Sequence, residues 1–367
     1  MTKPLRIGVL GAGWAAGLHL EGFRRTPGVV LAAICSRTRR RAELRADEFG
    51  IHRVIDSVED LVDAVDVVTI ATPPDAHLAP ALTALAAGRH LLCDKPLAVT
   101  ADDARTMLDA ARKAGTHHAA GFIWRGDPAL IRMRDLLRAG AIGPILEIHS
   151  TCALGVPPLP MTWMYEAERG GGALAQHGSH VVDRARWLVG GDFTEAQGRL
   201  HHDLKEATDA GGFSDITEAF AWAREHAGVK GPTSAVSADT GYDFTAVLSN
   251  GVRALFWEAW HLGGPAEDEV VVFGENGTLS WRGNGGLTLY RPRTAPEQLA
   301  DAAAGSGANT PREVGLTRWA GLAAAFTRAI QGDETAEHPT LVDGWQVAAV
   351  SDAVRRSSIS GSRETVR

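Results

Sequence analysis

Short apolar runs alternate with helix-length amphipathic segments over the first 120 residues, and this alternation restricts the possible folds more than any other feature of the sequence. It predicts β-α-β units, in which consecutive strands pair in parallel. We therefore expect an N-terminal α/β domain with a doubly wound parallel sheet. The expected strands cover residues 6–10, 29–35, 67–71, 90–93 and 117–120, with a weaker one near 54. The expected helices cover residues 14–25, 38–49, 75–87 and 101–114.

The pattern changes after about residue 121, which indicates a second domain. A predicted helix over 128–139 leads into a predicted strand over 145–153. Further on, Asn250-Gly251 and Asn276-Gly277 favour tight antiparallel hairpins. They separate alternating runs that predict strands over 242–248, 252–260, 269–273, 277–281 and 287–290. We expect domains over 1–123 and 124–367, the second an α+β domain with an open, largely antiparallel sheet and a C-terminal helix free to pack back toward the first.

Three parts of the second domain carry further expectations. An open antiparallel sheet usually covers its free face with helices or another subunit, so we expect a homodimer or homotetramer through this sheet. Residues 295–311, rich in Ala, Gly, Pro and Ser, predict a flexible loop before helices over 313–330 and 341–357. An additional helical segment from Ser214 to His226 is compatible with a lid, an oligomer contact or an inert insertion.

Composition and charge exclude several classes of protein. No stretch approaches the roughly 18 consecutive apolar residues of a membrane span. A net charge of −7 opposes nucleic-acid binding, which requires a basic surface. Cys35, Cys93 and Cys152 lie far apart without metal-like spacing, so we expect neither a metal site nor a disulfide framework. The first apolar run starts at residue 5, which leaves no room for an export signal, and we expect a cytoplasmic protein.

A glycine motif lies at the first junction between strand and helix. The segment Gly11-Ala12-Gly13-Trp14-Ala15-Ala16 has the form G-x-G-x-x-A. Gly11 permits the tight turn, Gly13 lets the backbone approach a pyrophosphate, and Ala16 is small enough for helix and strand to pack closely. The amides at the start of the helix then face the phosphates. In this position the motif predicts a Rossmann domain that binds a dinucleotide.

The end of the second strand bears on the choice between the two nicotinamide dinucleotides. NAD-specific sites usually have Asp or Glu there, to hold both ribose hydroxyls. This strand ends Ile34-Cys35-Ser36-Arg37, without a carboxylate. Ser36 can hydrogen-bond a 2′-phosphate, and Arg37 with Arg40 or Arg41 can pair with it. The sequence predicts NADP or NAD as the cofactor, with NADP favoured.

Two segments of the first domain, with this motif, resemble the Gfo/Idh/MocA family of oxidoreductases. The segment Ala71-Thr72-Pro73-Pro74-Asp75-Ala76-His77 is similar to a family loop that borders the cofactor. Asp94-Lys95-Pro96 is similar to the family's Glu-Lys-Pro signature. The resemblance implies that Lys95 touches the substrate hydroxyl and the nicotinamide ribose, and that a cis peptide bond precedes Pro96.

Two later segments extend the resemblance over nearly the whole chain. The segment 121–125, followed by Asp127-Pro128, resembles the crossover into the second domain. Arg125 is expected to face the substrate or to brace the structure there, and Trp124 is a candidate substrate contact. The segment 170–183 resembles the glycine-rich entry to the catalytic helix. His180 matches the family's histidine, whereas Gln176 stands where the family commonly has Asp. Four residues apart on a helix, Gln176 and His180 share one face. His177 points elsewhere, and we expect it to be packed or solvated.

The resemblance implies an NAD(P)-dependent oxidoreductase that moves a hydride between a nicotinamide and a hydroxyl or keto carbon of a sugar, a sugar derivative or a cyclitol. His180 is the expected general base, because histidine titrates near neutrality. Lys95 is expected to stabilise the developing alkoxide, and Trp163 to stack on a sugar ring. Gln176 is expected to act with Lys95 and His180 as a catalytic and substrate-contacting residue, but its neutral amide leaves open how the protons are distributed in the site. Two alternatives remain: redox-assisted glycoside cleavage and a non-catalytic, dinucleotide-binding sugar sensor.

Overall fold

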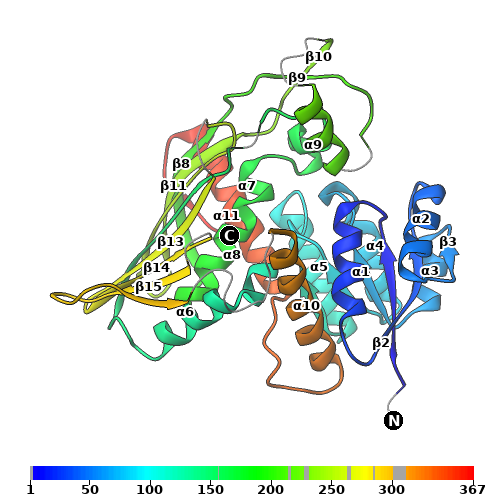
Figure 1. Cartoon of the computed structure of the whole chain (residues 1–367), viewed down its shortest axis with the longest axis horizontal. Helices are drawn as coiled ribbons and strands as arrows, with labels where there is room; N and C mark the ends of the chain where they lie inside the picture. The colour runs from blue at the N-terminus through cyan, green and yellow to red at the C-terminus, as the bar shows by residue number, and fades with distance from the viewer. Residues whose placement is uncertain are drawn as a thin grey trace. The chain divides into compact units, whose positions relative to one another are not determined.

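The computed structural model describes residues 3–155, 157–213, 216–226, 231–262, 266–283, 286–300 and 311–367, with only the backbone described at 311 and 312. The chain forms two units (Figure 1). The first consists mainly of Met1–Gly126 and Gly315–Ala348, and the second mainly of residues 127–213, 218–314 and Ala349–Arg367.

The first unit contains a six-stranded parallel sheet in the order β3-β2-β1-β4-β5-β6. Reversal of the strand order beside β1 makes the sheet doubly wound, which confirms the expected fold class. Helix α3 is not predicted from the sequence, because its seven residues are too few to show a helical period. The strands are β1 (Leu5–Leu10), β2 (Val29–Cys35), β3 (Val54–Ile55), β4 (Val67–Ile70), β5 (His90–Cys93) and β6 (His118–Ala120). The helices are α1 (Trp14–Arg24), α2 (Arg39–Phe49), α3 (Val58–Ala64), α4 (Leu78–Ala86) and α5 (Ala101–Ala114).

Side-chain caps fix where several helices begin. The Ser57 hydroxyl accepts from the Asp60 amide and starts α3, and Thr100 caps α5 in the same way through the Asp103 amide. In the second unit, Asp127 accepts from the amides of residues 129 and 130 and starts α6 (Pro128–Arg138). Each cap satisfies amides that have no partner within the helix.

Helix α10 (Pro311–Ile330) belongs largely to the first unit, although it follows the second domain in sequence. Its Trp319, Leu322, Ala323 and Phe326 lie in the same buried apolar cluster as residues of β1 and α1. Figure 1 shows α10 beside α1. Helix α11 (Leu341–Ser360) contributes to the first unit up to Ala348 and to the second beyond it. The first stretch of the first unit ends at Gly126, near the expected boundary at 123/124, and the apolar face of α10 covers the Rossmann core, so this unit is discontinuous in sequence.

The second unit contains a nine-stranded sheet in the order β16-β15-β14-β13-β7-β12-β11-β8-β17. All neighbours in it are antiparallel except β7 and β12, which confirms an open, largely antiparallel sheet. Its longer strands are β7 (Ile145–Ala153), β8 (Phe193–His201), β11 (Gly241–Leu248), β12 (Arg253–Ala259), β13 (Glu267–Gly274), β14 (Gly277–Arg282) and β15 (Gly286–Tyr290). Short strands are β9 (Glu206–Thr208), β10 (Thr233–Ala235), β16 (Glu297–Ala300) and β17 (Glu364–Thr365), of which β9 and β10 pair separately.

Side chains along these strands alternate between a buried and a more open face. On β7, Ile148, Ser150 and Cys152 are buried, whereas their neighbours are not. Helices α6 and α8 (Gly178–Val189) pack on the sheet. The open face therefore lies on the side from which Glu147 and His149 project.

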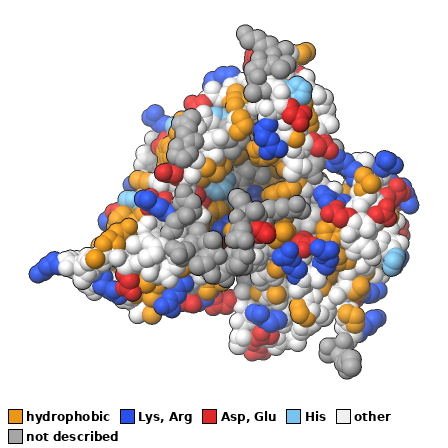
Figure 2. Space-filling view, in the orientation of Figure 1, with side chains coloured by type: hydrophobic (Ala, Val, Ile, Leu, Met, Phe, Trp, Pro, Cys, Tyr) orange, Lys and Arg blue, Asp and Glu red, His pale blue; other side chains and the backbone are white. Residues whose placement is uncertain are grey.

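Several expectations fall partly outside the described residues or need correction. Within the expected loop 295–311, residues Glu297–Ala300 form β16, because they pair with β15; residues 301–310 lie outside the described part of the chain. The segment Ser214–His226 contains α9 (Ile216–Glu225), and Ser214 is not described. Among the described residues, no helix has the length and apolar character to cross a membrane. Basic and acidic side chains are interspersed on the face shown in Figure 2.

Candidate active site

The glycine motif forms a turn between β1 and α1 that has no room for larger residues. Gly11 has a φ of 118°, and a Cβ on it would collide with the Ala71 carbonyl oxygen. Its amide donates to the Cys35 carbonyl at 2.8 Å, which ties the turn to the end of β2. Gly13 occupies the position before α1, where no side chain caps the helix. The start of α1 therefore presents backbone amides suited to a pyrophosphate; its first residues are Trp14, Ala15 and the buried Ala16.

The two residues that follow β2 are an uncharged polar residue, Ser36, and an arginine, Arg37. The Ser36 hydroxyl accepts from the Thr38 amide at 3.4 Å, and Arg37 is exposed. Arg41 is half-buried on α2. The neighbouring Arg39 is already bound to the carboxylates of Asp56 and Glu43.

The loop 71–77 is fixed from beneath by a histidine. His77 is fully buried, and its ring nitrogens lie 2.8 Å from the Thr72 carbonyl oxygen and 3.2 Å from that of Leu97. Burial lowers the pKa of His77, so the ring is neutral near pH 7. The ring joins this loop to the segment after Lys95. The predicted contact of His77 with the cofactor stays a prediction. Ala71, Thr72, Pro73 and Pro74 are the other residues of the loop that can border a cofactor.

Lys95 follows β5 in a turn that contains a cis bond before Pro96, as the resemblance implied. The Asp94 carboxylate accepts from the Lys95 amide at 2.8 Å through Oδ1, and its Oδ2 lies 3.5 Å from Nε2 of the buried His19. Burial alone would raise the pKa of Asp94, but His19 and Lys95 hold it below its usual value. Asp94 is therefore an ionised carboxylate, and Lys95 is half-buried.

The crossover residues are braced within the first unit. Arg125 lies in a short 3₁₀ turn and forms an ion pair with Asp343 of α11 at 2.8 Å, with both side chains largely buried. The Arg318 guanidinium lies 4.6 Å from the centre of the Trp124 ring. Of the two roles expected for Arg125, the contacts favour bracing.

The glycine-rich entry to the catalytic helix contains a buried aspartate. Gly172 has a φ of 105°, and a Cβ on it would collide with the Asp239 carboxylate. That carboxylate accepts from the Leu174 amide at 2.8 Å and so supports the start of α7 (Ala173–Gln176). Burial raises the pKa of Asp239 to about 6. Sequence reasoning missed Asp239, because nothing near it in the chain indicates that it reaches a helix start.

Gln176 and His180 are separated by a break between α7 and α8 at His177, whose backbone stays in the helical region. Both side chains are largely buried. The Gln176 amide Nε2 donates to the Gly170 carbonyl at 2.7 Å. This hydrogen bond links Gln176 to the glycine-rich segment before α7. An aspartate at this position could not form it, because an ionised carboxylate has no donor. Trp163, in a 3₁₀ turn before this entry, is half-buried and so can reach a ligand.

His177 belongs to a buried hydrogen-bonded cluster around Glu258 of β12. The Glu258 carboxylate is fully buried; it lies 3.0 Å from His177 Nδ1 and accepts from the Tyr242 hydroxyl at 2.8 Å and the Trp260 indole at 2.7 Å. Burial alone would lower the pKa of His177, but the Glu258 charge raises it above its usual value. Of the two environments expected for His177, packed or solvated, the structure shows the packed one. Alternation along β12 places residue 258 on the buried face, and this signal could have revealed Glu258.

Comparison with known proteins decides the family. A model described as "Oxidoreductase family, NAD-binding Rossmann fold" matches residues 5–122, and the GFO/IDH/MocA C-terminal domain matches residues 130–280. The dTDP-3,4-didehydro-2,6-dideoxy-alpha-D-glucose 3-reductase of Streptomyces violaceoruber is 30% identical over 71% of this chain and 70% of that protein. The chain belongs to the Gfo/Idh/MocA oxidoreductase family. The resemblance that its motifs suggested is confirmed.

Other members of the Gfo/Idh/MocA family match shorter parts of the chain. The 1,5-anhydro-D-fructose reductase of Ensifer adhaerens is 35% identical over 53% of this chain, and the match spans 60% of that protein. The levoglucosan dehydrogenase of Pseudarthrobacter phenanthrenivorans is 30% identical over 63% of this chain and 62% of that protein. A structure of levoglucosan dehydrogenase, apo form, has a TM-score of 0.85 at 23% identity and covers 100% of this chain and 99% of that one, which shows the same fold.

Within each unit, the family fold gathers part of the predicted site. In the first, hydrogen bonds from Gly11 to Cys35, from Ala71 to Leu10 and from Asp94 to Ile70 align the strand ends that carry the glycine motif, the 71–77 loop and the Lys95 turn. A ligand at this edge lies at the carboxyl ends of parallel strands, where such sheets bind dinucleotides. In the second unit, Gln176 ends α7 and His180 lies in the first turn of α8.

Proposed function

We propose that the protein is an NAD(P)-dependent oxidoreductase that transfers a hydride between the nicotinamide and a hydroxyl or keto carbon of a sugar, a sugar derivative or a cyclitol. The observation that carries this proposal is the Lys95 turn. It follows β5 at the carboxyl end of the parallel sheet, where the glycine motif suited to a dinucleotide follows β1 with β4 between them, in a chain of this family. Relatives named as sugar reductases and dehydrogenases support the substrate class.

The residues of the first unit fit a nicotinamide dinucleotide. Gly11 permits the tight turn against the Ala71 carbonyl that any side chain would prevent, and the uncapped start of α1 offers amides for the pyrophosphate. When bound, the cofactor supplies the hydride chemistry. The protein then has to bind and orient the substrate and to manage the hydroxyl proton.

Lys95 and His180 have different tasks at the substrate hydroxyl: one stabilises its oxygen and the other transfers its proton. Lys95 donates a charged hydrogen bond to the reacting oxygen and stabilises it as negative charge develops there. His180 takes the hydroxyl proton in the oxidative direction and returns it in the reductive one. Gln176 holds the glycine-rich entry through Gly170, so it positions this helical segment without adding a charge.

The proposed activity is tested by the absorbance of reduced nicotinamide, with NAD and NADP screened against a panel of sugars, cyclitols and their keto forms. We expect at least one substrate to change the absorbance steadily. Turnover without any net change in the reduced cofactor would indicate redox-assisted cleavage instead. Binding of cofactor and sugar with no turnover across the panel would indicate a sensor.

The cofactor preference is a finer proposal, in which NADP is favoured over NAD. Support comes from the end of β2, where Ser36 and Arg37 replace the carboxylate that would repel a 2′-phosphate. We expect Ser36→Asp to shift the ratio of the two dissociation constants toward NAD by about tenfold or more, equivalent to about 1.4 kcal/mol. Ser36→Ala, which adds no charge, should change the ratio much less. Equal binding of NAD and NADP by the wild type would contradict the preference.

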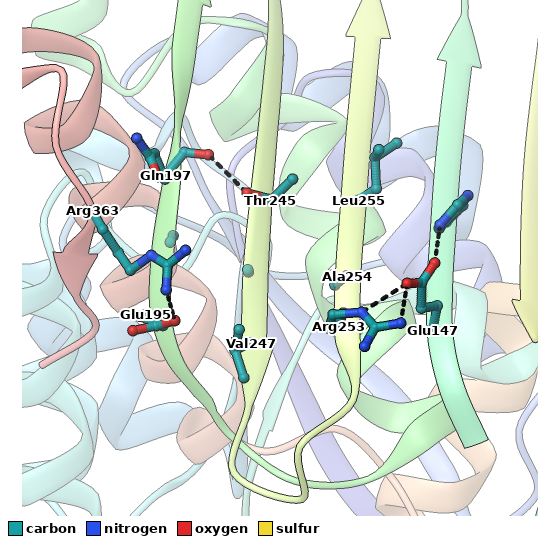
Figure 3. Close-up of a pocket in the computed structure, with 12 residues that line it drawn as sticks. Glu147, Glu195, Gln197, Thr245, Val247, Arg253, Ala254, Leu255 and Arg363 are labelled. Carbon is teal, nitrogen blue, oxygen red and sulfur yellow. Dashed lines mark hydrogen bonds and ion pairs between the residues drawn. The ribbon is translucent and has the colours of Figure 1, made fainter. Parts of the chain in front are cut away.

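A homodimer or homotetramer through the open face of the large sheet is also proposed. A hollow of about 290 Å³ on this face is lined by side chains of neighbouring strands, including Thr245, Val247 and Leu255 (Figure 3). Ion pairs of Glu147 with Arg253 and of Glu195 with Arg363 lie along it. A mixed apolar and charged sheet face of this kind suits contact with a second copy of itself.

We expect Leu255→Arg to lower the mass of the assembly, because it adds a charge to an exposed apolar position of this face. Leu44→Arg, at an exposed leucine of α2 in the first unit, is the matched control and should leave the mass unchanged. Light scattering coupled to gel filtration measures both. A monomeric wild type, or an unchanged mass for Leu255→Arg, would contradict the proposed interface.

A further inference from the structure

A buried histidine lies behind the Lys95 turn. His19 of α1 is fully buried, and its Nδ1 lies 2.6 Å from the Thr69 hydroxyl of β4. On the other side of the ring, Nε2 faces the Asp94 carboxylate at 3.5 Å. The Trp319 ring, 4.0 Å away between centres, covers it. Polar groups buried in this way cost free energy unless they are paired, and an apolar side chain would fill the space at lower cost.

The surroundings of His19 determine which nitrogen carries the proton. With a proton on Nε2, the ring donates toward Asp94 while Nδ1 accepts from the Thr69 hydroxyl. The opposite tautomer would place a nitrogen lone pair against a carboxylate. The contacts therefore favour the Nε2–H form, in a chain that runs from Thr69 through His19 to Asp94. At 3.5 Å the last contact is longer than an ordinary hydrogen bond, so the N–H acts on the carboxylate as an electrostatic contact.

The Asp94 carboxylate is confined on both of its oxygens. Oδ1 accepts from the Lys95 amide at 2.8 Å, and Oδ2 faces His19. A Cβ at residue 121 would lie 2.5 Å from Oδ1, so Gly121 provides the space that the carboxylate occupies. A displacement of the Asp94 carboxylate would therefore also displace the Lys95 backbone, and with it the Lys95 side chain.

We propose that His19 is a positioning residue for Lys95: held by Thr69, it orients the Asp94 carboxylate, which fixes the backbone amide of Lys95. The proposal rests on the proposed function, in which Lys95 acts on the reacting oxygen. His19 itself contacts neither substrate nor reacting atoms. Its contribution appears in turnover, because a displacement of about 1 Å at a catalytic group can cost about 100-fold in rate.

Three variants separate the hydrogen-bonding role of His19 from its packing. His19→Leu removes both ring nitrogens, and His19→Gln returns an N–H near the position of Nε2. Thr69→Val keeps His19 but removes the hydroxyl that selects its tautomer. We expect His19→Leu to lower kcat by about 10- to 100-fold with KM changed much less, Thr69→Val to lower it by a smaller factor, and His19→Gln to recover most of the loss. The dissociation constant for the cofactor should change little.

The pH profile of kcat distinguishes the two roles of His19, because a loss of packing alone would not shift the acid limb of this profile. The charged or titratable groups facing Asp94 are His19, Lys95, His77 and Cys93. Loss of His19 raises the pKa of Asp94, so the acid limb of kcat should move to higher pH in His19→Leu and return toward the wild type in His19→Gln. In an Asp94→Asn background, His19→Leu should cost little more, because it acts through that carboxylate.

Lys95→Met, assayed beside these variants, separates this inference from the proposed function. If Lys95→Met keeps full turnover, Lys95 has no part in the mechanism and the inference fails, whereas the proposed function fails only if the wild type turns over no substrate of the panel. If Lys95→Met is impaired but His19→Leu has wild-type kcat and an unmoved acid limb, only the inference is overturned. Equal losses in His19→Leu and His19→Gln, additive with Asp94→Asn, would also overturn it and leave His19 with a packing role.

Discussion

Lys95→Met is expected to lower kcat/KM by on the order of 10³-fold while the protein still folds and binds cofactor. Methionine keeps the length of the side chain but removes the charged donor, so the developing alkoxide loses its stabilisation. Losses of about 10²–10³-fold follow when one such donor is removed from an oxyanion site. Steady-state kinetics with the best substrate of the panel measures the loss, and calorimetric titration with cofactor confirms binding.

The matched control for this variant is Lys113→Met. Lys113 is an exposed lysine in the last turn of α5, so the same chemical change there should leave kcat/KM near the wild-type value. Retention of full activity by Lys95→Met would remove Lys95 from the mechanism. Loss of activity together with loss of cofactor binding would assign it to binding rather than to alkoxide stabilisation.

Glu258→Ala is expected to lower the free energy of unfolding by about 3–5 kcal/mol, the range found when one partner of a buried ion pair is removed. His177, Tyr242 and Trp260 all donate to this carboxylate, so the substitution leaves two buried donors and one partly buried donor without their acceptor. Glu258→Gln keeps an acceptor oxygen and should lose less. Urea denaturation measures the difference, and Glu43→Gln in the exposed pair with Arg39 should have a far smaller effect.

The pH dependence of stability provides a second test of the Glu258 cluster. The pKa of His177 is raised in the folded state, so the folded protein binds this proton more tightly than the unfolded chain. The stabilisation is fully present below the ordinary histidine pKa of about 6.5 and is lost as pH rises through the higher folded value. We expect this loss in the wild type and not in Glu258→Gln. An equal pH dependence in both proteins would contradict an imidazolium at His177.

The parts of the site that could be predicted from sequence are those whose backbone conformation is determined by residues close together in the chain. The glycine motif 11–16 and the turn around Lys95 depend on neighbouring residues, and both have the expected backbone. The nine-residue strand 145–153 shows its period and was predicted with its bounds. In contrast, α3 is a single short segment without a measurable period.

The buried polar partners could not be predicted, because each depends on residues far away in the chain. His19 meets Thr69 fifty positions later, and Asp239 reaches the start of α7 from 65 positions away. His77 was expected at the cofactor because its loop resembles one that borders it, but its ring turns toward backbone carbonyls. Only Glu258 left a local signal, through its position on the buried side of β12.

The central claim, hydride transfer to or from a sugar carbon, is tested most directly by isotope transfer. The reduced cofactor, deuterated at both C4 positions, is incubated with the protein and the keto sugar that the panel identifies, and the product is analysed by mass spectrometry. We expect the wild type to yield a sugar alcohol with one deuterium on the former keto carbon, and Lys95→Met to yield far less. A product without deuterium would contradict hydride transfer from the nicotinamide to the sugar.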